Sequence, residues 1–345
     1  MRLFKLSSVL LIFSLLLVIV GCGKNEGSDA SAQGSEKPAS TASASSSPEA
    51  APAADEVRVF EHSMGKTEIK GTPKRVVVLE WTYGEDLLAL GVQPVGFADI
   101  ATYKQYVNIE PQLGADVVDV GTRQEPNLET IASLKPDLII LAHFRGQESY
   151  PLLSKIAPTL VFNSYPEEGK GDQYQEMVDT FKTIADVLGK KAEAEAVLAD
   201  LDKVYADSKA KLESAGKTDK PFVLALAYSN QNAVQFRLST DNSLAVKILE
   251  HIGLTNAYKP AKFEVYGFST TDVEALPPVQ DANFIHMIQE SDNVIENQLK
   301  DNAIWKNLSF VKENRVYALG GDTWPYGGPL SAKIIAGKIV DLLTK

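Results

Sequence analysis

The stretch from Asp172 to Leu188, DQYQEMVDTFKTIADVL, opens the longest purely helical pattern in this chain. Its large apolar residues recur every three or four positions, which is the spacing of one face of an α-helix. The pattern resumes after Gly189 and continues to Leu212, and no strand pattern follows before Phe222. The sequence therefore predicts a helical segment over residues 172–216 that includes one long helix.

Short β-branched runs alternate with helical patterns on both sides of this segment. Buried strands are predicted before it at Arg75–Leu79, Asp137–Leu141 and Thr159–Phe162. Strand and helix patterns alternate again after it, at Phe222–Leu226, Ser243–His251, Phe284–Met287 and Leu330–Leu343. Such alternation is typical of α/β folds. We therefore expect two α/β lobes, residues 56–171 and 217–345, with any ligand in the cleft between them.

One predicted helix of the first lobe has clear signals at both ends. Thr82 and Glu85 have the spacing of a capping box, and Gly91 suits a C-terminal cap. We therefore expect a helix from Thr82 to Leu90.

The first 22 residues have the pattern of an export signal. Arg2 and Lys5 precede the apolar run from Val9 to Val20, which is too short to span a bilayer easily and suits a signal peptide. The run leads into Ile-Val-Gly-Cys22, which resembles the bacterial lipobox and contains the only cysteine of the chain. The sequence predicts cleavage after residue 21 and a diacylated Cys22, which anchors the protein to the outer face of the cell membrane. The alternative is an uncleaved anchor with a chance cysteine.

A tether is predicted next, over residues 22–55. From Gly23 to Asp55 the chain is rich in Ser, Ala, Gly, Pro and Glu and contains no aromatic residue. Such a segment buries too little apolar surface to offset its ordering entropy, so we expect it to be disordered.

Composition and motifs exclude several classes of protein. The formal net charge of -11 argues against a nucleic-acid partner, and a single cysteine excludes a disulfide scaffold. The four histidines are scattered, so we expect no metal site formed by protein ligands. No G-x-S-x-G or Walker motif is present, so we expect no catalytic residues and no enzyme activity.

Several local motifs resemble the iron-siderophore substrate-binding lipoproteins of ABC importers, above all the ferric-hydroxamate and ferric-citrate binding proteins of Gram-positive bacteria. The motifs lie at residues 75–81, 91–96, 120–129, 134–140, 156–158 and 324–331. The resemblance implies a class III periplasmic-binding-protein fold, in which one long helix bridges two Rossmann-like lobes. It also implies a monomer without a cofactor, which delivers a ferric siderophore to an ABC permease for iron uptake.

A ferric siderophore presents oxygen atoms around an iron that it already coordinates, so the protein needs N–H donors and aromatic walls rather than metal ligands. Arg123 follows a predicted strand at Val117–Val120 and matches the family's siderophore-binding arginine. Arg145 follows the strand at Asp137–Leu141 in the same way. We expect Arg123→Ala or Arg145→Ala to weaken binding about 10- to 100-fold with little effect on folding. The alternative for Arg123 is a surface salt bridge with Glu125.

Aromatic residues and a third arginine complete the expected pocket. The candidates are Trp81, Tyr83, Tyr266, Trp324, Tyr326 and Arg237. Three or four of the five aromatic residues are expected to line the cleft, and the alternative for Arg237 is a surface ion pair.

The resemblance also implies docking to the permease through one glutamate on each lobe. Glu129 matches the first, and Glu274 is the best match for the second, with Asp272 close beside it. Both are expected near the start of a helix, and the alternative for each is a local stabilising role there through the helix macrodipole. The sequence does not say which siderophore is bound, and it leaves open a haem or cobalamin receptor and, as a weaker alternative, an extracellular α/β enzyme.

Overall fold

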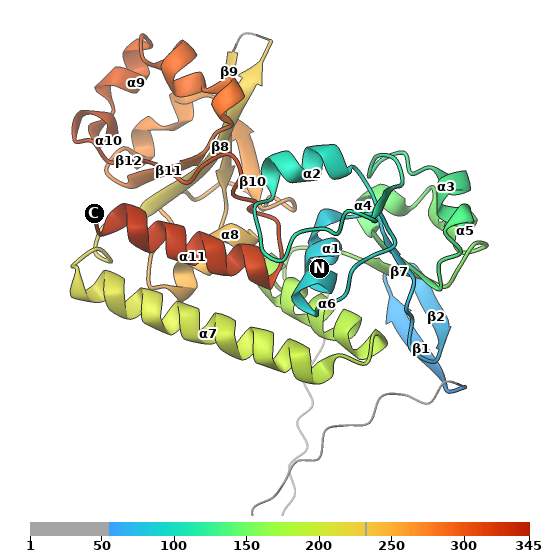
Figure 1. Cartoon of the computed structure of the whole chain (residues 1–345). Helices are drawn as coiled ribbons and strands as arrows, with labels where there is room; N and C mark the ends of the chain where they lie inside the picture. Colours follow the sequence, from blue (N-terminus) through green and yellow to red (C-terminus); the bar gives the residue numbers. More distant parts are fainter. Residues whose placement is uncertain (1–54, 232) are drawn as a thin grey trace, which may run out of the picture. The chain divides into compact units, whose positions relative to one another are not determined.

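The structure is a computed structural model that describes residues 55–231 and 233–345 (Figure 1). The predicted signal peptide, Cys22 and all but the last residue of the predicted tether lie outside the described residues. Within the described ranges, no helix combines the length and the apolar character needed to cross a membrane.

The first lobe has a five-stranded parallel sheet with the order β5-β4-β3-β6-β7. Its strands are β3 (Val76–Val78), β4 (Gly96–Phe97), β5 (Val118–Asp119), β6 (Leu138–Ala142) and β7 (Thr159–Phe162). An antiparallel hairpin that the sequence reading missed precedes them, formed by β1 (Val57–His62) and β2 (Gly65–Lys70). The helices are α1 (Trp81–Ala89), α2 (Ile100–Tyr106), α3 (Leu128–Ser133), α4 (His143–Gly146) and α5 (Tyr150–Leu153). The four strands predicted for this lobe are confirmed, the one at Val117–Val120 as the short β5.

The central strands are apolar because both of their faces are buried. Every residue of β3, β6 and β7 is buried. Val76 and Val78 face one apolar cluster, whereas Val77 faces another on the opposite side of the sheet. This explains why the strands read as continuous apolar runs without a polar alternation.

Helix α1 is confirmed, but its predicted capping box is wrong. The N-cap is Glu80, whose side chain accepts a hydrogen bond from the Trp81 N–H. Thr82 donates its hydroxyl to the Tyr326 carbonyl at 2.5 Å instead, and Glu85 accepts from the backbone and hydroxyl of Ser331 at 2.7 and 2.6 Å. Both residues of the expected box therefore bind the second lobe, which fixes the first turn of α1 against it.

The helical segment is confirmed as α6 (Gln173–Val187) and α7 (Lys191–Ser214), separated at Gly189 with a φ of +65°. Near its start, α7 buries Ala194 in the core of the first lobe. Further along, it buries Leu201 and Leu212 in the core of the second lobe. Figure 1 shows α7 (yellow-green) running beside α11. One helix thus contributes to both lobes, as expected.

The second lobe has a five-stranded mixed sheet with the order β10-β9-β8-β11-β12. Its strands are β8 (Phe222–Asn230), β9 (Ala233–Ser239), β10 (Phe268–Thr271), β11 (Asn283–Met287) and β12 (Val316–Ala318). Only the pairs of β11 are parallel, since β8, β9 and β10 form an antiparallel meander that the sequence reading missed. The α-helices are α8 (Leu244–His251), α9 (Ala303–Asn307), α10 (Ser309–Lys312) and α11 (Pro329–Leu343). Short turns of 3-10 or π type are η1 (Val273–Ala275), η2 (Pro277–Val279), η3 (Glu290–Asp292) and η4 (Ile295–Leu299).

Candidate functional site

Two neighbouring cavities lie between the lobes, with volumes of about 370 and 500 Å³. Residues of both lobes line each of them. The two cavities share four lining residues, namely Arg123, Arg237, Trp324 and Tyr326. We call these four residues the shared wall. The predicted cleft between the lobes is therefore present, and four of the predicted site residues stand at its centre.

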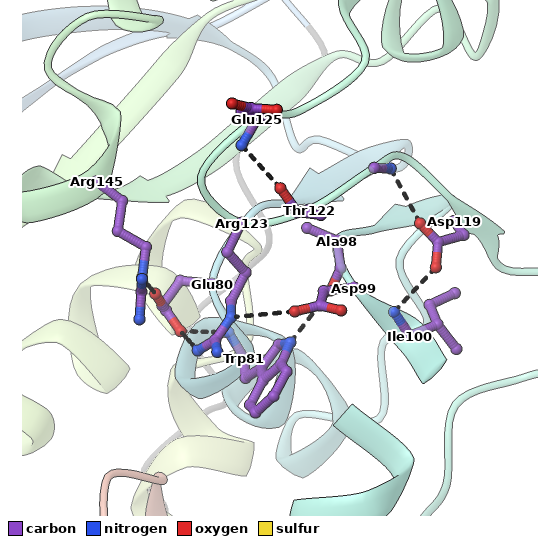
Figure 2. A network of polar contacts seen from close by, with 11 residues as sticks. Glu80, Trp81, Ala98, Asp99, Ile100, Asp119, Thr122, Arg123, Glu125 and Arg145 are labelled. Atoms are coloured by element: carbon purple, nitrogen blue, oxygen red, sulfur yellow. Dashed lines mark hydrogen bonds and ion pairs between the residues drawn. The ribbon is translucent and has the colours of Figure 1, made fainter. Parts of the chain in front are cut away.

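The smaller cavity contains a buried ion-pair network (Figure 2). Glu80, which is 4% exposed, lies just after β3 and accepts a hydrogen bond on each carboxylate oxygen. Arg123 Nη1 lies 2.8 Å from Glu80 Oε1, and Arg145 Nε lies 2.9 Å from Glu80 Oε2. Glu80 therefore holds both predicted arginines, each of which approaches from a loop or short helix at the carboxyl end of a strand.

The alternative partner of Arg123 is excluded by this geometry. Glu125 is exposed and donates its backbone N–H to the Thr122 hydroxyl, whereas Arg123 forms its ion pairs with Glu80 at 2.8 Å and Asp99 at 3.8 Å. The sequence reading missed Glu80. The available signal was a carboxylate placed directly after a buried strand.

The indole ring of Trp81 packs against the Arg123 guanidinium. The Arg123 guanidinium carbon lies 3.5 Å from the centre of the Trp81 ring, a cation–π contact. Trp81 is 1% exposed, and its indole N–H donates to the Ala98 carbonyl at 3.1 Å. Its ring also lies 5.0 Å from that of Trp324. Trp81 thus lines the larger cavity mainly as a platform for the shared wall.

Aromatic side chains enclose the smaller cavity on both lobes. Tyr266 is half-exposed and meets Tyr165 edge to face at 5.1 Å. Trp324 meets Tyr326 in the same way at 5.2 Å. Four of the five predicted aromatic residues therefore line the cavities. The sequence reading missed the further lining residues Tyr106, Phe144, Tyr165, Tyr228 and Phe268.

Tyr83 is the predicted aromatic residue that does not line the cleft. No part of its side chain is exposed, and its hydroxyl lies 2.7 Å from that of Ser164. Burial raises the pKa of Tyr83 well above its usual value. Because it offers a ligand no surface, Tyr83 is a core residue in this structure, and its proposed ligand role is not retained.

Three buried N–H groups of the shared wall have no hydrogen-bond acceptor among the described residues. They are Arg123 Nε, Arg237 Nε and Trp324 Nε1. The Arg237 guanidinium lies between the rings of Phe268 and Tyr228, at 4.7 and 5.5 Å. Buried donors are normally satisfied, so this wall is suited to a ligand that brings oxygen atoms.

Glu176 of α6 is a further cavity residue that the sequence reading missed. Its carboxylate accepts a hydrogen bond from the Thr180 hydroxyl at 2.6 Å. Burial raises the pKa of Glu176 to about 7, against the lowering effect of that hydrogen bond. This carboxyl therefore changes charge near neutral pH at the edge of the cavity.

Comparison with known proteins places the chain in a family. The model of the periplasmic binding protein family matches residues 76–323. The chain belongs to this family. It is 34% identical to the Fe(3+)-citrate-binding protein YfmC of Bacillus subtilis over 94% of this chain and 91% of that protein. It is 30% identical to the iron(3+)-hydroxamate-binding protein FhuD of Escherichia coli over 75% of this chain and 83% of that protein.

Solved structures show the same fold. The siderophore-binding protein FhuD of Vibrio cholerae, solved with Fe3+-Desferal, is 32% identical, with a TM-score of 0.70, and covers 79% of this chain and 98% of its own. SirA of Staphylococcus aureus, solved with staphyloferrin B, is 26% identical, with a TM-score of 0.63. The match covers 82% of this chain and 97% of the SirA chain. The class III fold expected from the sequence is thereby confirmed.

The two predicted docking glutamates are both exposed, one on each lobe. Glu129 lies in the first turn of α3, where the cap is formed by Asn127, which accepts from the Thr130 N–H. Glu274 lies in η1, where the cap is Asp272, which accepts from the Glu274 N–H at 2.9 Å. The helix expected at Glu274 is therefore a single 3-10 turn. Neither glutamate is the capping residue, but both lie in the first turn of their elements, so the alternative of a favourable charge at the N-terminus stays open for each.

The structure also bears on direct metal binding. Across residues 55–231 and 233–345, no three His, Cys, Asp or Glu side chains are grouped so that they could hold a metal ion. His286 is largely buried, and burial lowers its pKa to about 4.

Proposed function

We propose that this protein is an extracytoplasmic lipoprotein that captures a ferric siderophore and passes it to an ABC permease. The observation that carries the proposal is the shared wall, where Arg123, Arg237 and Trp324 each present a buried N–H that finds no acceptor in the described part of the chain. A ferric siderophore satisfies such donors, because its outer surface is rich in carboxylate, hydroxamate or carbonyl oxygens. The siderophore supplies all the ligands of its iron, so the protein needs none of its own.

The names of the relatives support this class of ligand. They include proteins that bind ferric citrate and ferric hydroxamates, and a structural relative was solved with a ferric hydroxamate. The aromatic walls add apolar contact for the ligand's backbone. Both lobes contribute donors, Arg123 from the first and Arg237 with Trp324 from the second. A bound ligand therefore joins the two lobes.

We further propose the location and the delivery route. Lipidation of Cys22 holds the protein at the outer face of the membrane, as the names of related lipoproteins also suggest. Glu129 and Glu274 are exposed carboxylates on separate lobes and suit docking to a cationic permease surface. The protein acts as a monomer that carries one ferric complex per cycle.

A fluorescence titration tests the ligand class. Trp324 lies in the shared wall, so a bound ferric complex quenches tryptophan emission. The titration uses ferric citrate, a ferric mixed citrate-hydroxamate, ferric desferrioxamine B, a ferric catecholate, haem and cobalamin, each with its iron-free form as a control where one exists. We expect saturable quenching by a citrate or hydroxamate complex, with unchanged ligand absorbance. Saturation only by haem or cobalamin, or chemical conversion of the ligand, would overturn the proposal.

A further inference from the structure

The smaller cavity has many charged groups but little net charge. Its charged lining residues are Arg123, Arg145, Arg237, Glu80 and Glu176. Three positive and two negative groups leave one positive charge when both glutamates are ionised. The cavity therefore offers guanidinium donors without a strongly positive potential.

Glu80 is responsible for this balance at the arginine pair. Its side chain is 4% exposed, and its two oxygens lie 2.8 and 2.9 Å from Arg123 and Arg145. Glu80 Oε1 also accepts the Trp81 N–H at 3.0 Å, which fixes the carboxylate at the start of α1. The countercharge is thus held by the backbone as well as by the arginines.

We propose that Glu80 determines which ferric complexes the cleft accepts. It positions Arg123 and Arg145 and, together with Asp99, which lies 3.8 Å from Arg123, it offsets their charge, so complexes of low net charge bind better than highly anionic ones. This inference rests on the proposed function and specifies its ligand class by charge.

The size of the effect follows from Coulomb's law. A ligand charge about 8 Å from Glu80, at an effective dielectric constant of about 40 for an open cleft, changes the affinity about five-fold. Removing the Glu80 charge strengthens the binding of an anion and weakens that of a cation. Loss of arginine positioning instead weakens the binding of both. The ratio of the affinities for an anionic and a cationic ligand therefore measures the effect of the Glu80 charge. A change common to both affinities measures the effect of arginine positioning.

The test compares Glu80→Gln and Glu80→Asp by tryptophan quenching and isothermal titration. The probes are ferric citrate, which is anionic, and ferric desferrioxamine B, which is cationic through its free amine. In Glu80→Gln we expect the affinity ratio of citrate to desferrioxamine to rise about 25-fold. If the wild type binds only one probe, the two variants are compared for that probe, and Glu80→Gln should bind citrate more tightly, or desferrioxamine more weakly, than Glu80→Asp does. In Glu80→Asp, which keeps the charge but shortens the side chain, we expect both affinities to fall at least three-fold and the ratio to stay constant.

The control is Glu125→Gln, which removes an exposed charge from the loop of Arg123 without touching the ion pair. It should change the ratio less than two-fold. Far-UV circular dichroism checks that each variant folds. If Glu80→Gln does not fold, Arg145→Gln makes the opposite charge change and must lower the affinity ratio of citrate to desferrioxamine. An unchanged ratio in the Gln variant overturns the charge role, and wild-type affinities in the Asp variant overturn the positioning role. A wild-type protein that binds no ferric complex instead contradicts the proposed function itself.

Discussion

Replacing Arg123 by alanine should destabilise the ligand-free protein as well as weaken ligand binding. The Arg123 and Glu80 side chains are 11% and 4% exposed, and their charged atoms lie 2.8 Å apart. Breaking a buried ion pair by removing one partner typically costs about 3–5 kcal/mol. Glu80 keeps Arg145 and the Trp81 N–H as partners. We therefore expect a loss of about 2 kcal/mol, the size of one hydrogen bond to a charged group.

Urea unfolding of wild type, Arg123→Ala, Glu80→Gln and the double variant measures this loss. Because the two side chains share one ion pair, the double variant should be more stable than the sum of the single effects predicts, by at least about 1 kcal/mol. The single Arg123→Ala change should also lower the melting temperature by about 4–6 °C. Ligand affinity, measured separately, should fall about 10- to 100-fold.

Two results would refute this reasoning. An Arg123→Ala variant as stable as wild type would mean that the ion pair with Glu80 does not form in the ligand-free protein. Additive effects in the double variant would mean that the two residues act independently. The first result would restore the expectation from sequence that Arg123 affects binding alone.

Three further predictions concern other parts of the molecule. The pKa of Glu176 is raised in the folded state to about 7, so its contribution to stability is present at low pH and lost as the pH rises from about 4.5 to 7. The stability advantage of Glu176→Gln over wild type should therefore grow by about 1–3 kcal/mol across that range, as measured by urea unfolding at successive pH values. A difference that does not change with pH would contradict this prediction. The double change Glu129→Ala with Glu274→Ala should preserve siderophore binding in solution and abolish iron uptake by cells, so normal uptake at normal protein levels would remove the docking assignment. Replacing Cys22 by Ser should abolish acylation and leave the protein unprocessed or released, as followed by labelled palmitate, and continued acylation would contradict the lipobox interpretation.

Much of the first lobe could be predicted because its strands are buried on both faces. Thr159–Phe162 was predicted with the bounds that the structure gives, since a continuous apolar run between polar turns has one simple explanation. The antiparallel meander of the second lobe was harder. In β9 (Ala233–Ser239) apolar Val234, Phe236 and Leu238 alternate with polar Gln235 and Arg237, and the sequence reading overlooked this period-2 strand signal. Arg237 takes a polar position of that alternation and lines both cavities.

The main physical origin of the failures at the site is contact between distant segments. Glu80 and Arg123 are 43 positions apart, and Thr82 and Glu85 bind partners more than 240 positions away. No local pattern reports such pairs. Trp81 and Tyr83 illustrate a second cause, because positions two apart on a helix point to nearly opposite sides. The first ring therefore lines the cleft, whereas the second enters the core.

The central claim is that N–H donors of both lobes hold an oxygen-rich ferric complex in the cleft. A crystal structure of the protein with the ferric complex that gives the strongest quenching measures this most directly. We predict that ligand oxygens lie within about 3 Å of Arg123, Arg237 and Trp324 Nε1, with every iron ligand supplied by the siderophore. A complex bound outside the two cavities, or an iron held by protein side chains, would contradict the account.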